Sequence, residues 1–139
     1  MFAARAQLIS EKINNSDKDI VLFDRFYDAS MAYQGFGRGL PQEIIKSLIS
    51  FTKCPVPDAT FLLDIEVEEG FKRKFNDKKD RIESSGEVFF EQVRSGYLAL
   101  SKNEPNRIKV LDAKKSIDDL HNDIVSSVSY THLTLPTKA

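Results

Sequence analysis

Two adjacent charged residues, Asp24 and Arg25, follow the short apolar run at residues 20–23. A continuous apolar run of this length is typical of a parallel strand that is buried on both faces. An arginine at the end of such a strand can bind a phosphate through two parallel hydrogen bonds. The aspartate can orient that arginine or hold the water shell of a metal ion. These two residues alone are equally well explained as a structural ion pair at the end of the strand.

The segment at residues 28–39 adds further polar groups directly after this pair. It contains a hydroxyl, a phenol, an amide and a second arginine, on Ser30, Tyr33, Gln34 and Arg38, together with three glycines. Such groups can hydrogen-bond the edge of a base and its sugar, and glycines let the backbone approach a ligand closely. The segment is therefore a candidate nucleotide contact, although a simple surface loop would have the same composition.

The overall composition is that of one globular domain. The 139 residues are 41% apolar and 29% charged, with a formal net charge of −1, so no general attraction to nucleic acid or to an anionic membrane is expected. No apolar run approaches the roughly 20 residues that span a bilayer, and the sequence does not open with the pattern of a signal peptide. We expect a cytoplasmic protein whose one cysteine, Cys54, stays reduced.

Apolar runs at residues 20–23, 60–65 and 108–112 predict three strands, each with an aspartate at or next to its carboxyl end. Helices are predicted at residues 1–13, 30–34, 41–52, 67–74, 88–102 and 116–128. Strands that alternate with helices indicate an α/β fold with a parallel sheet and right-handed crossovers. Ligands of such sheets bind at the carboxyl ends of the strands.

Two of the predicted helices carry more specific signals. The helix at residues 41–52 is expected to bury one apolar stripe, formed by Ile44, Ile45, Leu48, Ile49 and Phe51. In the last helix, Ser116 and Asp119 have the spacing of a capping box at its first turn.

The end of the chain differs from the rest. Residues 129–139 have no helical or strand periodicity and no charge before Lys138. We expect this segment to be a non-native tail, similar to translated vector sequence, and residues 1–128 to form the domain.

Four blocks of the sequence together resemble bacterial thymidylate kinases. They are MFAARAQL, VLFDRFYDASMAYQGFGRGLP, PDATFLLDIEVEEGFKRK and DRIESSGEVFFEQVRSGYLAL. The blocks occur in the order of that family and the resemblance covers residues 1–125. The second block is the most diagnostic, because it combines the Asp-Arg step with the Ala-Tyr-Gln-Gly and Gly-Arg-Gly elements. The resemblance implies a P-loop NTPase-like parallel sheet flanked by helices.

The resemblance also implies a reaction and roles for residues. ATP would donate its γ-phosphoryl group to dTMP, with Mg²⁺ as cofactor, to give dTDP for dTTP biosynthesis. Arg5 matches the arginine that hydrogen-bonds thymine, and Arg25 matches the arginine that contacts the thymidylate phosphate, with Asp24 beside it. Further nucleotide contacts are implied for Ser30, Tyr33 and Gln34, and the ring of Tyr33 would crowd the 2′ position of the sugar.

The basic segment at residues 72–83 corresponds to the mobile lid that closes over ATP in this family. Arg73 and Lys78 are both candidates for the cation that reaches the transferring phosphoryl group. Asp80 matches an acidic position close to the nucleotide, and Glu83 matches one close to its magnesium. A run rich in lysine and arginine is also typical of a solvated helix end.

One family motif is absent from the 139 residues, the G-x-x-x-x-G-K-[ST] loop that holds the ATP phosphates. We therefore expect the chain to be the C-terminal part of a longer enzyme, to lack the first strand, and to have no measurable kinase activity alone. Members of the family are commonly homodimers, and the stripe at residues 44–51 could form that interface or pack on the sheet.

Two other functions stay open on the sequence alone. The first is a related deoxynucleoside or nucleotide kinase with another base preference. The second is a non-catalytic domain that binds a nucleotide without any phosphoryl transfer.

Overall fold

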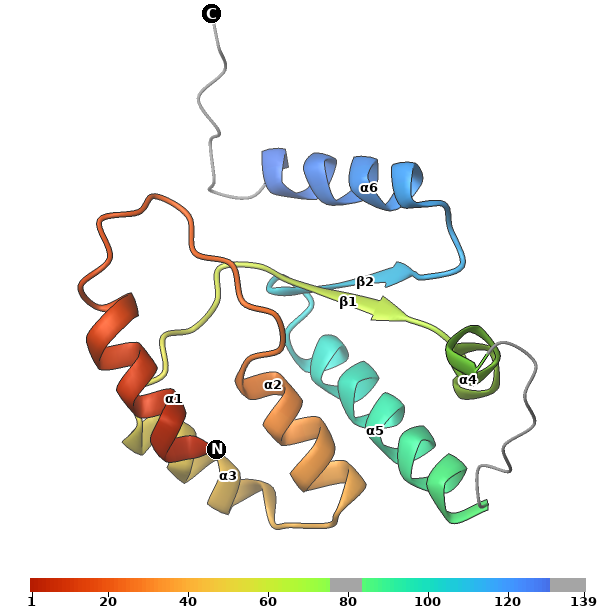
Figure 1. Cartoon of the computed structure of the whole chain (residues 1–139), viewed down its shortest axis with the longest axis horizontal. Coiled ribbons are helices and arrows are strands. Elements are labelled where there is room, and N and C mark those ends of the chain that lie inside the picture. Colours follow the sequence, from red (N-terminus) through yellow and green to blue (C-terminus); the bar gives the residue numbers. More distant parts are fainter. Residues whose placement is uncertain (76–83, 131–139) are drawn as a thin grey trace, which may run out of the picture.

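Two parallel strands lie between helices on both faces in a computed structural model that describes residues 1–75 and 84–130 (Figure 1). The strands are β1 (Thr60–Asp64) and β2 (Ile108–Asp112), and they pair in register from Thr60 opposite Ile108 to Asp64 opposite Asp112. Both lie where the sequence predicts them. The strands confirm the α/β prediction, because a parallel pair needs a crossover, here provided by helices.

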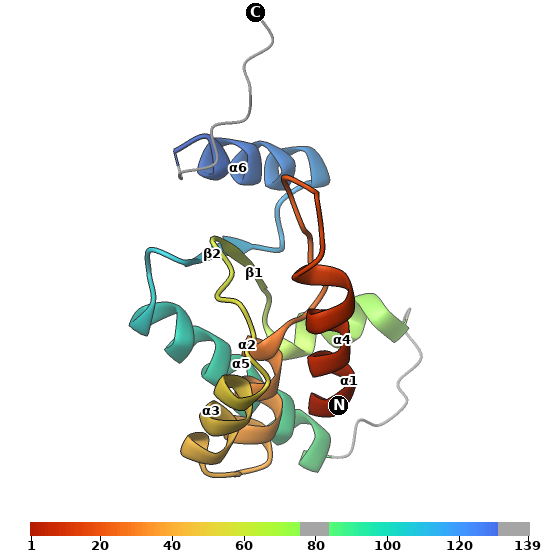
Figure 2. The same ribbon diagram turned by 90° about the vertical axis from the view of Figure 1, so that its left-hand side faces the viewer.

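The helices form a layer on each face of this sheet, as two perpendicular views agree (Figures 1 and 2). One face is covered by α6 (Ile117–Tyr130). On the other face lie α1 (Phe2–Leu8), α2 (Tyr27–Ser30), α3 (Gln42–Phe51) and α5 (Ser84–Asn103). Helix α4 (Val67–Phe75) follows the carboxyl end of β1. The core between the sheet and the larger layer contains Met31, Ile45, Leu100 and Ile108.

The prediction of a strand at residues 20–23 is wrong. Within the described residues the sheet consists of β1 and β2, and residues 20–23 form no part of it. Their apolar side chains are largely exposed, with Leu22 at 90%. An apolar run becomes a strand only where a neighbouring strand satisfies its backbone N–H and C=O groups, and here neither β1 nor β2 does so.

The helix predicted at residues 30–34 is longer than expected. Helix α2 runs directly into the π-helix η2 (Met31–Gly37), so residues 27–37 form one continuous helical segment. Its wide turns are closed by bonds such as Arg38 N–H to the Tyr33 carbonyl, at 3.0 Å. Helix α1 likewise continues as the π-helix η1 (Ile9–Ile13). Such turns are frequent at functional sites.

The apolar stripe predicted on α3 is only partly buried. Ile45 is fully buried and Ile49 half-buried, whereas Ile44, Leu48 and Phe51 are exposed, Phe51 at 85%. The five residues are too widely distributed around the helix for one packing partner to cover them. Helix α3 therefore has two apolar faces, and the structure buries one.

Ser116 and Asp119 meet at the amino end of α6, as predicted, in a looser form of the capping box. The Asp119 amide donates to the Ser116 hydroxyl oxygen at 3.1 Å, and that hydroxyl donates to the Asp119 carboxylate at 2.7 Å. The helix continues to Tyr130, two residues into the segment expected to be a tail, and residues 131–139 lie outside the described residues. None of the described helices combines the length and apolarity needed to cross a membrane.

Helix α5 and η2 approach closely because glycines lie at their contact. A Cβ atom on Gly96 would lie 2.6 Å from Cγ of Phe36, and one on Gly37 would lie 2.7 Å from Cε2 of Phe89. Both distances are far below van der Waals contact. The sequence therefore uses glycine at these two positions to bring the aromatic residues of η2 and α5 together.

We predict that Gly96→Ala lowers the free energy of unfolding by about 1–3 kcal/mol, because the added methyl overlaps the Phe36 ring. Urea denaturation would measure the loss. Gly70→Ala on α4 is the matched control, since its Cβ would meet only Ile65 Cγ2, at an ordinary 3.5 Å. Because alanine favours a helix more than glycine does, this variant should leave the free energy of unfolding unchanged or raise it by up to about 1 kcal/mol. Equal stability of the two variants would contradict the close-packing argument.

Candidate functional site

Helices α1 and α2 bring Arg5 and Ser30 into contact. Arg5 Nη1 donates to the Ser30 hydroxyl oxygen at 3.1 Å, and Ser30 is buried. The Arg5 guanidinium carbon also lies 5.2 Å from the centre of the Phe2 ring and 5.4 Å from that of Phe26. These rings favour the cation and restrict its position. Two predicted nucleotide contacts, far apart in sequence, therefore form one polar pair.

Arg25 lies against two tyrosines. Its guanidinium carbon is 4.7 Å from the centre of the Tyr33 ring, and its charge acts on the Tyr97 phenol, whose pKa it lowers. Its backbone φ is 61°, in the left-handed region that non-glycine residues seldom adopt. Strain of this kind, on the order of 1–3 kcal/mol, is concentrated at ligand and active sites. Asp24 beside it is exposed.

The two tyrosines come from different elements. Tyr33 on η2 meets Tyr97 on α5 edge-on, with ring centres 6.4 Å apart, and meets Phe89 at 6.1 Å. Burial, above all, raises the pKa of Tyr97, while the positive charge of Arg25 acts in the opposite direction. Tyr97 is therefore a neutral phenol at physiological pH. We call Arg5, Arg25, Ser30, Tyr33 and Tyr97 the arginine–tyrosine group.

Gln34, which follows Tyr33 on η2, carries an unused acceptor. Its Oε1 atom is buried and has no hydrogen-bond partner among the residues that the structure describes. Most buried polar atoms do have one, and leaving an acceptor unpaired costs about 1–3 kcal/mol. A ligand that brings an N–H group to this atom would remove that cost.

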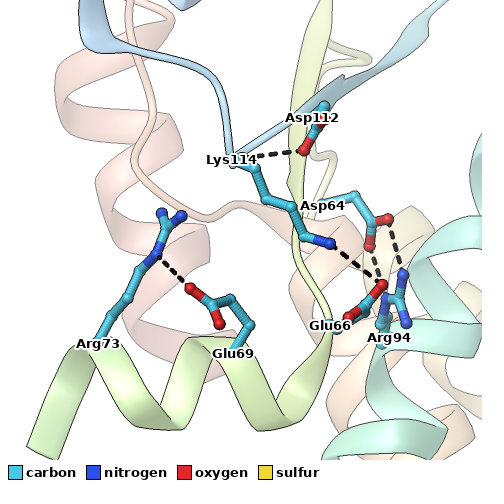
Figure 3. A network of polar contacts seen from close by, with 7 residues as sticks. All are labelled: Asp64, Glu66, Glu69, Arg73, Arg94, Asp112 and Lys114. Carbon is cyan, nitrogen blue, oxygen red and sulfur yellow. Dashed lines mark hydrogen bonds and ion pairs between the residues drawn. The ribbon is translucent and has the colours of Figure 1, made fainter.

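A second set of charged residues lies at the carboxyl ends of β1 and β2, and Figure 3 shows it. Arg94 donates from Nε and Nη2 to the two carboxylate oxygens of Asp64, at 2.8 and 3.0 Å. Lys114 pairs with Glu66 at 3.2 Å, and its backbone amide donates to Asp112. We call this set the strand-end cluster; its members are Asp64, Glu66, Glu69, Arg73, Arg94, Asp112 and Lys114.

Arg73 belongs to the strand-end cluster rather than to the arginine–tyrosine group. Its Nη1 donates to the Ala113 carbonyl oxygen at 2.9 Å, and its Nε lies 3.4 Å from Glu69 Oε1. A cavity of about 280 Å³ lies between β1, α4 and α5, and both Arg94 and Tyr97 line it. Arg94 belongs to the strand-end cluster and Tyr97 to the arginine–tyrosine group, so the cavity adjoins both of them.

Three predicted site residues, Lys78, Asp80 and Glu83, lie outside the described residues. In residues 1–75 and 84–130, no three His, Cys, Asp or Glu side chains are grouped closely enough to hold a metal ion.

Sequence reasoning missed Tyr97 and Arg94 as site residues. Neither residue belongs to a local pattern that marks it as part of a site. Their spacing of three places both on one face of α5, so the sequence does hold a signal. That signal becomes informative only once the partners Arg25 and Asp64 are known to lie opposite.

Comparisons with known proteins agree on one family. The family model described as Thymidylate kinase matches residues 1–124. The thymidylate kinase of Chlorobaculum tepidum is 39% identical over 140 residues, which cover 91% of this chain and 65% of that relative. The thymidylate kinase of Prochlorococcus marinus is 45% identical over 113 residues, covering 81% of this chain and 50% of the relative.

A solved structure gives the same result for the fold. The crystal structure of thymidylate kinase from Ehrlichia chaffeensis superposes with a TM-score of 0.70 and 27% sequence identity. The match covers 92% of this chain and 60% of that one. The chain thus spans about 65% of the length of the first of these relatives and a smaller share of the others.

We predict that the Asp64–Arg94 pair makes stability depend on pH. The hydrogen bond from Arg94, above all, lowers the pKa of Asp64 in the folded chain. The contribution is therefore fully present above the unfolded value of about 3.9 and is lost as pH falls through the lower folded value. Urea midpoints should show Asp64→Asn less stable than wild type at pH 7, with the difference shrinking below pH ~4.

Asp58→Asn is the control for this titration, because Asp58 is an exposed carboxylate outside the pair. At pH 7 its midpoint should lie close to that of wild type, as expected for an exposed residue. A constant difference between Asp64→Asn and wild type down to acid pH would show that the ion pair is not its source.

Proposed function

Because the chain belongs to the thymidylate kinase family, we propose that it binds dTMP as the acceptor for a phosphoryl group from ATP. The observation that carries the proposal is the arginine–tyrosine group, in which Arg5 meets Ser30 and Arg25 meets Tyr33 on one helical segment. Two cations, a phenol ring and a hydroxyl can together bind the phosphate, the base and the sugar of a nucleoside monophosphate. The 139 residues include no ATP phosphate loop, so dTMP binding is the part of the reaction proposed for this chain.

In the proposed complex each group has a separate role. The Arg25 guanidinium binds the dTMP phosphate through paired hydrogen bonds, and its contact with Tyr33 restrains its orientation. Arg5 donates to a thymine carbonyl oxygen. The free Oε1 of Gln34 accepts the N3–H of the base, and the Tyr33 ring crowds the 2′ position, which favours deoxyribose.

The proposed reaction joins an oxygen of the dTMP phosphate to the γ-phosphorus of ATP and breaks the bond from that phosphorus to the β,γ-bridging oxygen, so that ADP leaves. The protein aligns the two nucleotides and neutralises the charge on the moving group. Arg25, with Asp24 beside it, acts on the acceptor side. Arg73, and Lys78 of the undescribed segment, are the proposed donor-side cations, with Asp80 near the nucleotide.

Mg²⁺ would supply further charge neutralisation when bound with ATP. Its proposed protein contact, Glu83, lies outside the described residues, and no step above depends on it. The donor and acceptor proposed here are cytoplasmic metabolites, and we propose that location. We propose no nucleic acid or membrane partner. The comparisons do not favour a kinase with another base preference or a non-catalytic domain.

We further propose that the full protein is a homodimer that uses the exposed face of α3. Ile44, Leu48 and Phe51 recur at the i, i+4, i+7 spacing and are exposed, while the adjoining face of the helix already packs on the core through Ile45. An apolar helix face of this kind is typical of a subunit contact.

We predict that Arg25→Ala weakens dTMP binding by about 10- to 100-fold, the effect of losing hydrogen bonds to a charged group. Thymidine, which lacks the phosphate, should bind both proteins alike. Isothermal titration of the two ligands into each variant would measure this. Lys46→Ala removes an exposed charge on α3 and should change neither affinity. A wild-type chain that binds dTMP no better than thymidine or dCMP would refute the proposed function.

We predict that Phe51→Asp shifts the chain toward the monomer, because a carboxylate cannot be desolvated against a second apolar face. Analytical ultracentrifugation over a range of concentrations would measure the association. Val88→Asp, at an exposed apolar residue of α5, is the control and should leave association unchanged. A wild-type protein that stays monomeric at high concentration would exclude the α3 interface.

A further inference from the structure

A buried arginine at the amino ends of the strands uses every hydrogen-bond donor of its side chain. Arg107 Nη1 donates to Asp28 at 2.8 Å and to the Thr60 hydroxyl at 3.2 Å, and Nη2 donates to the second oxygen of Asp28 at 2.9 Å. Nε and Nη2 donate to the two oxygens of Glu104, at 2.6 and 2.9 Å. A guanidinium has five N–H groups, and all five are bonded while the residue is only 8% exposed.

The partners of Arg107 come from separate parts of the fold. Asp28 lies in the first turn of α2 and is itself buried, Thr60 begins β1, and Arg107 directly precedes β2. The Thr60 amide also donates to the Arg107 carbonyl at 2.8 Å. The arginine thus joins α2 to both strands at the amino end of the sheet, the end opposite to the strand-end cluster.

At the amino end of residues 27–37, the contacts other than the Asp28–Arg107 pair are mainly aromatic packing around Phe26 and the single Arg5–Ser30 hydrogen bond. The N-cap residue of this segment, Phe26, makes no side-chain capping bond, although such a bond normally fixes the first turn of a helix. The bidentate pairing of Asp28 with Arg107 constrains both distance and orientation. Rotation of the segment would break it and leave a buried charge unpaired.

We propose that Asp28 and Arg107 are a positioning pair for the dTMP site, an inference that rests on the function proposed above. They touch no nucleotide. They fix the rotation and the axial position of residues 27–37, and so determine where Ser30 and Tyr33 meet Arg5 and Arg25. A buried ion pair is weak support for stability, since apolar residues of similar volume stabilise as well or better. The Asp28–Arg107 pair differs from an apolar pair in that its hydrogen bonds have fixed directions, and these directions can set the orientation of the helix.

Asp28→Asn and Arg107→Gln test the pair by two readouts, hydrogen exchange of residues 27–37 in the ligand-free chain and dTMP affinity by titration. We expect each variant to speed exchange in that segment and to weaken dTMP binding by about tenfold, the value of one hydrogen bond to a charged group. Because the residues act as a unit, the double variant should be no weaker than the worse single one.

Leu111→Ala is the control for loss of stability alone. Leu111 is buried on β2, and its truncation should lower the melting temperature without changing exchange at residues 27–37 or dTMP affinity, measured well below that temperature. If Asp28→Asn behaves like Leu111→Ala, with lower Tm and both readouts at wild-type values, the pair is purely structural and the inference is overturned.

Arg107→Lys decides the matter if the first variants do not fold, because it keeps the charge and loses the paired geometry. Faster exchange and weaker binding in this variant support the positioning role, and wild-type values for both overturn it. A wild-type chain without dTMP affinity would refute the proposed function instead. The exchange measurement needs no ligand and would still decide whether Asp28 and Arg107 hold the segment.

Discussion

The close contact between η2 and α5 is the constraint on which the candidate site depends. Without side chains at Gly37 and Gly96, the two helices approach until Tyr33 meets Phe89 and Tyr97. That approach creates the aromatic surface on which the Arg25 guanidinium lies. The position of this cation is therefore set by backbone packing between two helices, because its own segment, residues 20–25, belongs to no strand or helix.

The two ends of the sheet are organised by different electrostatics. At the amino end, Arg107 is buried and fully hydrogen-bonded, so that it has no donor left for a ligand. At the carboxyl end, the strand-end cluster combines the half-buried Asp64–Arg94 pair with exposed pairs such as Lys114 with Glu66. Exposed pairs of this kind contribute little to stability. Their charges can be exchanged for those of a ligand at low cost, in keeping with the usual position of ligands in parallel α/β folds.

Residue type and local pattern predicted much of this arrangement, and contacts between distant residues account for what they missed. The strands at residues 60–64 and 108–112 were predictable, and the identical kind of run at residues 20–23 was not, because its pairing is not encoded within the run. Arg25 and Tyr33 could be singled out by residue type, and the structure brings them into contact. Asp28 and Arg107 are 79 residues apart, so no spacing rule could join them. On α3, periodicity marked the apolar residues but could not say which face is covered.

Two residues of the proposed dTMP site, Arg25 and Gln34, have energetic costs that the described fold does not offset. The same chain that bonds all five donors of Arg107 leaves the buried Oε1 of Gln34 without a partner among the described residues, and holds Arg25 at a strained φ of 61°. Both costs occur within ten residues of each other, beside Ser30 and Tyr33. A sequence able to build the Arg107 network could have avoided them if stability were the only requirement. Their coincidence is accounted for if a nucleotide supplies the missing donor and the anion that Arg25 is oriented to meet.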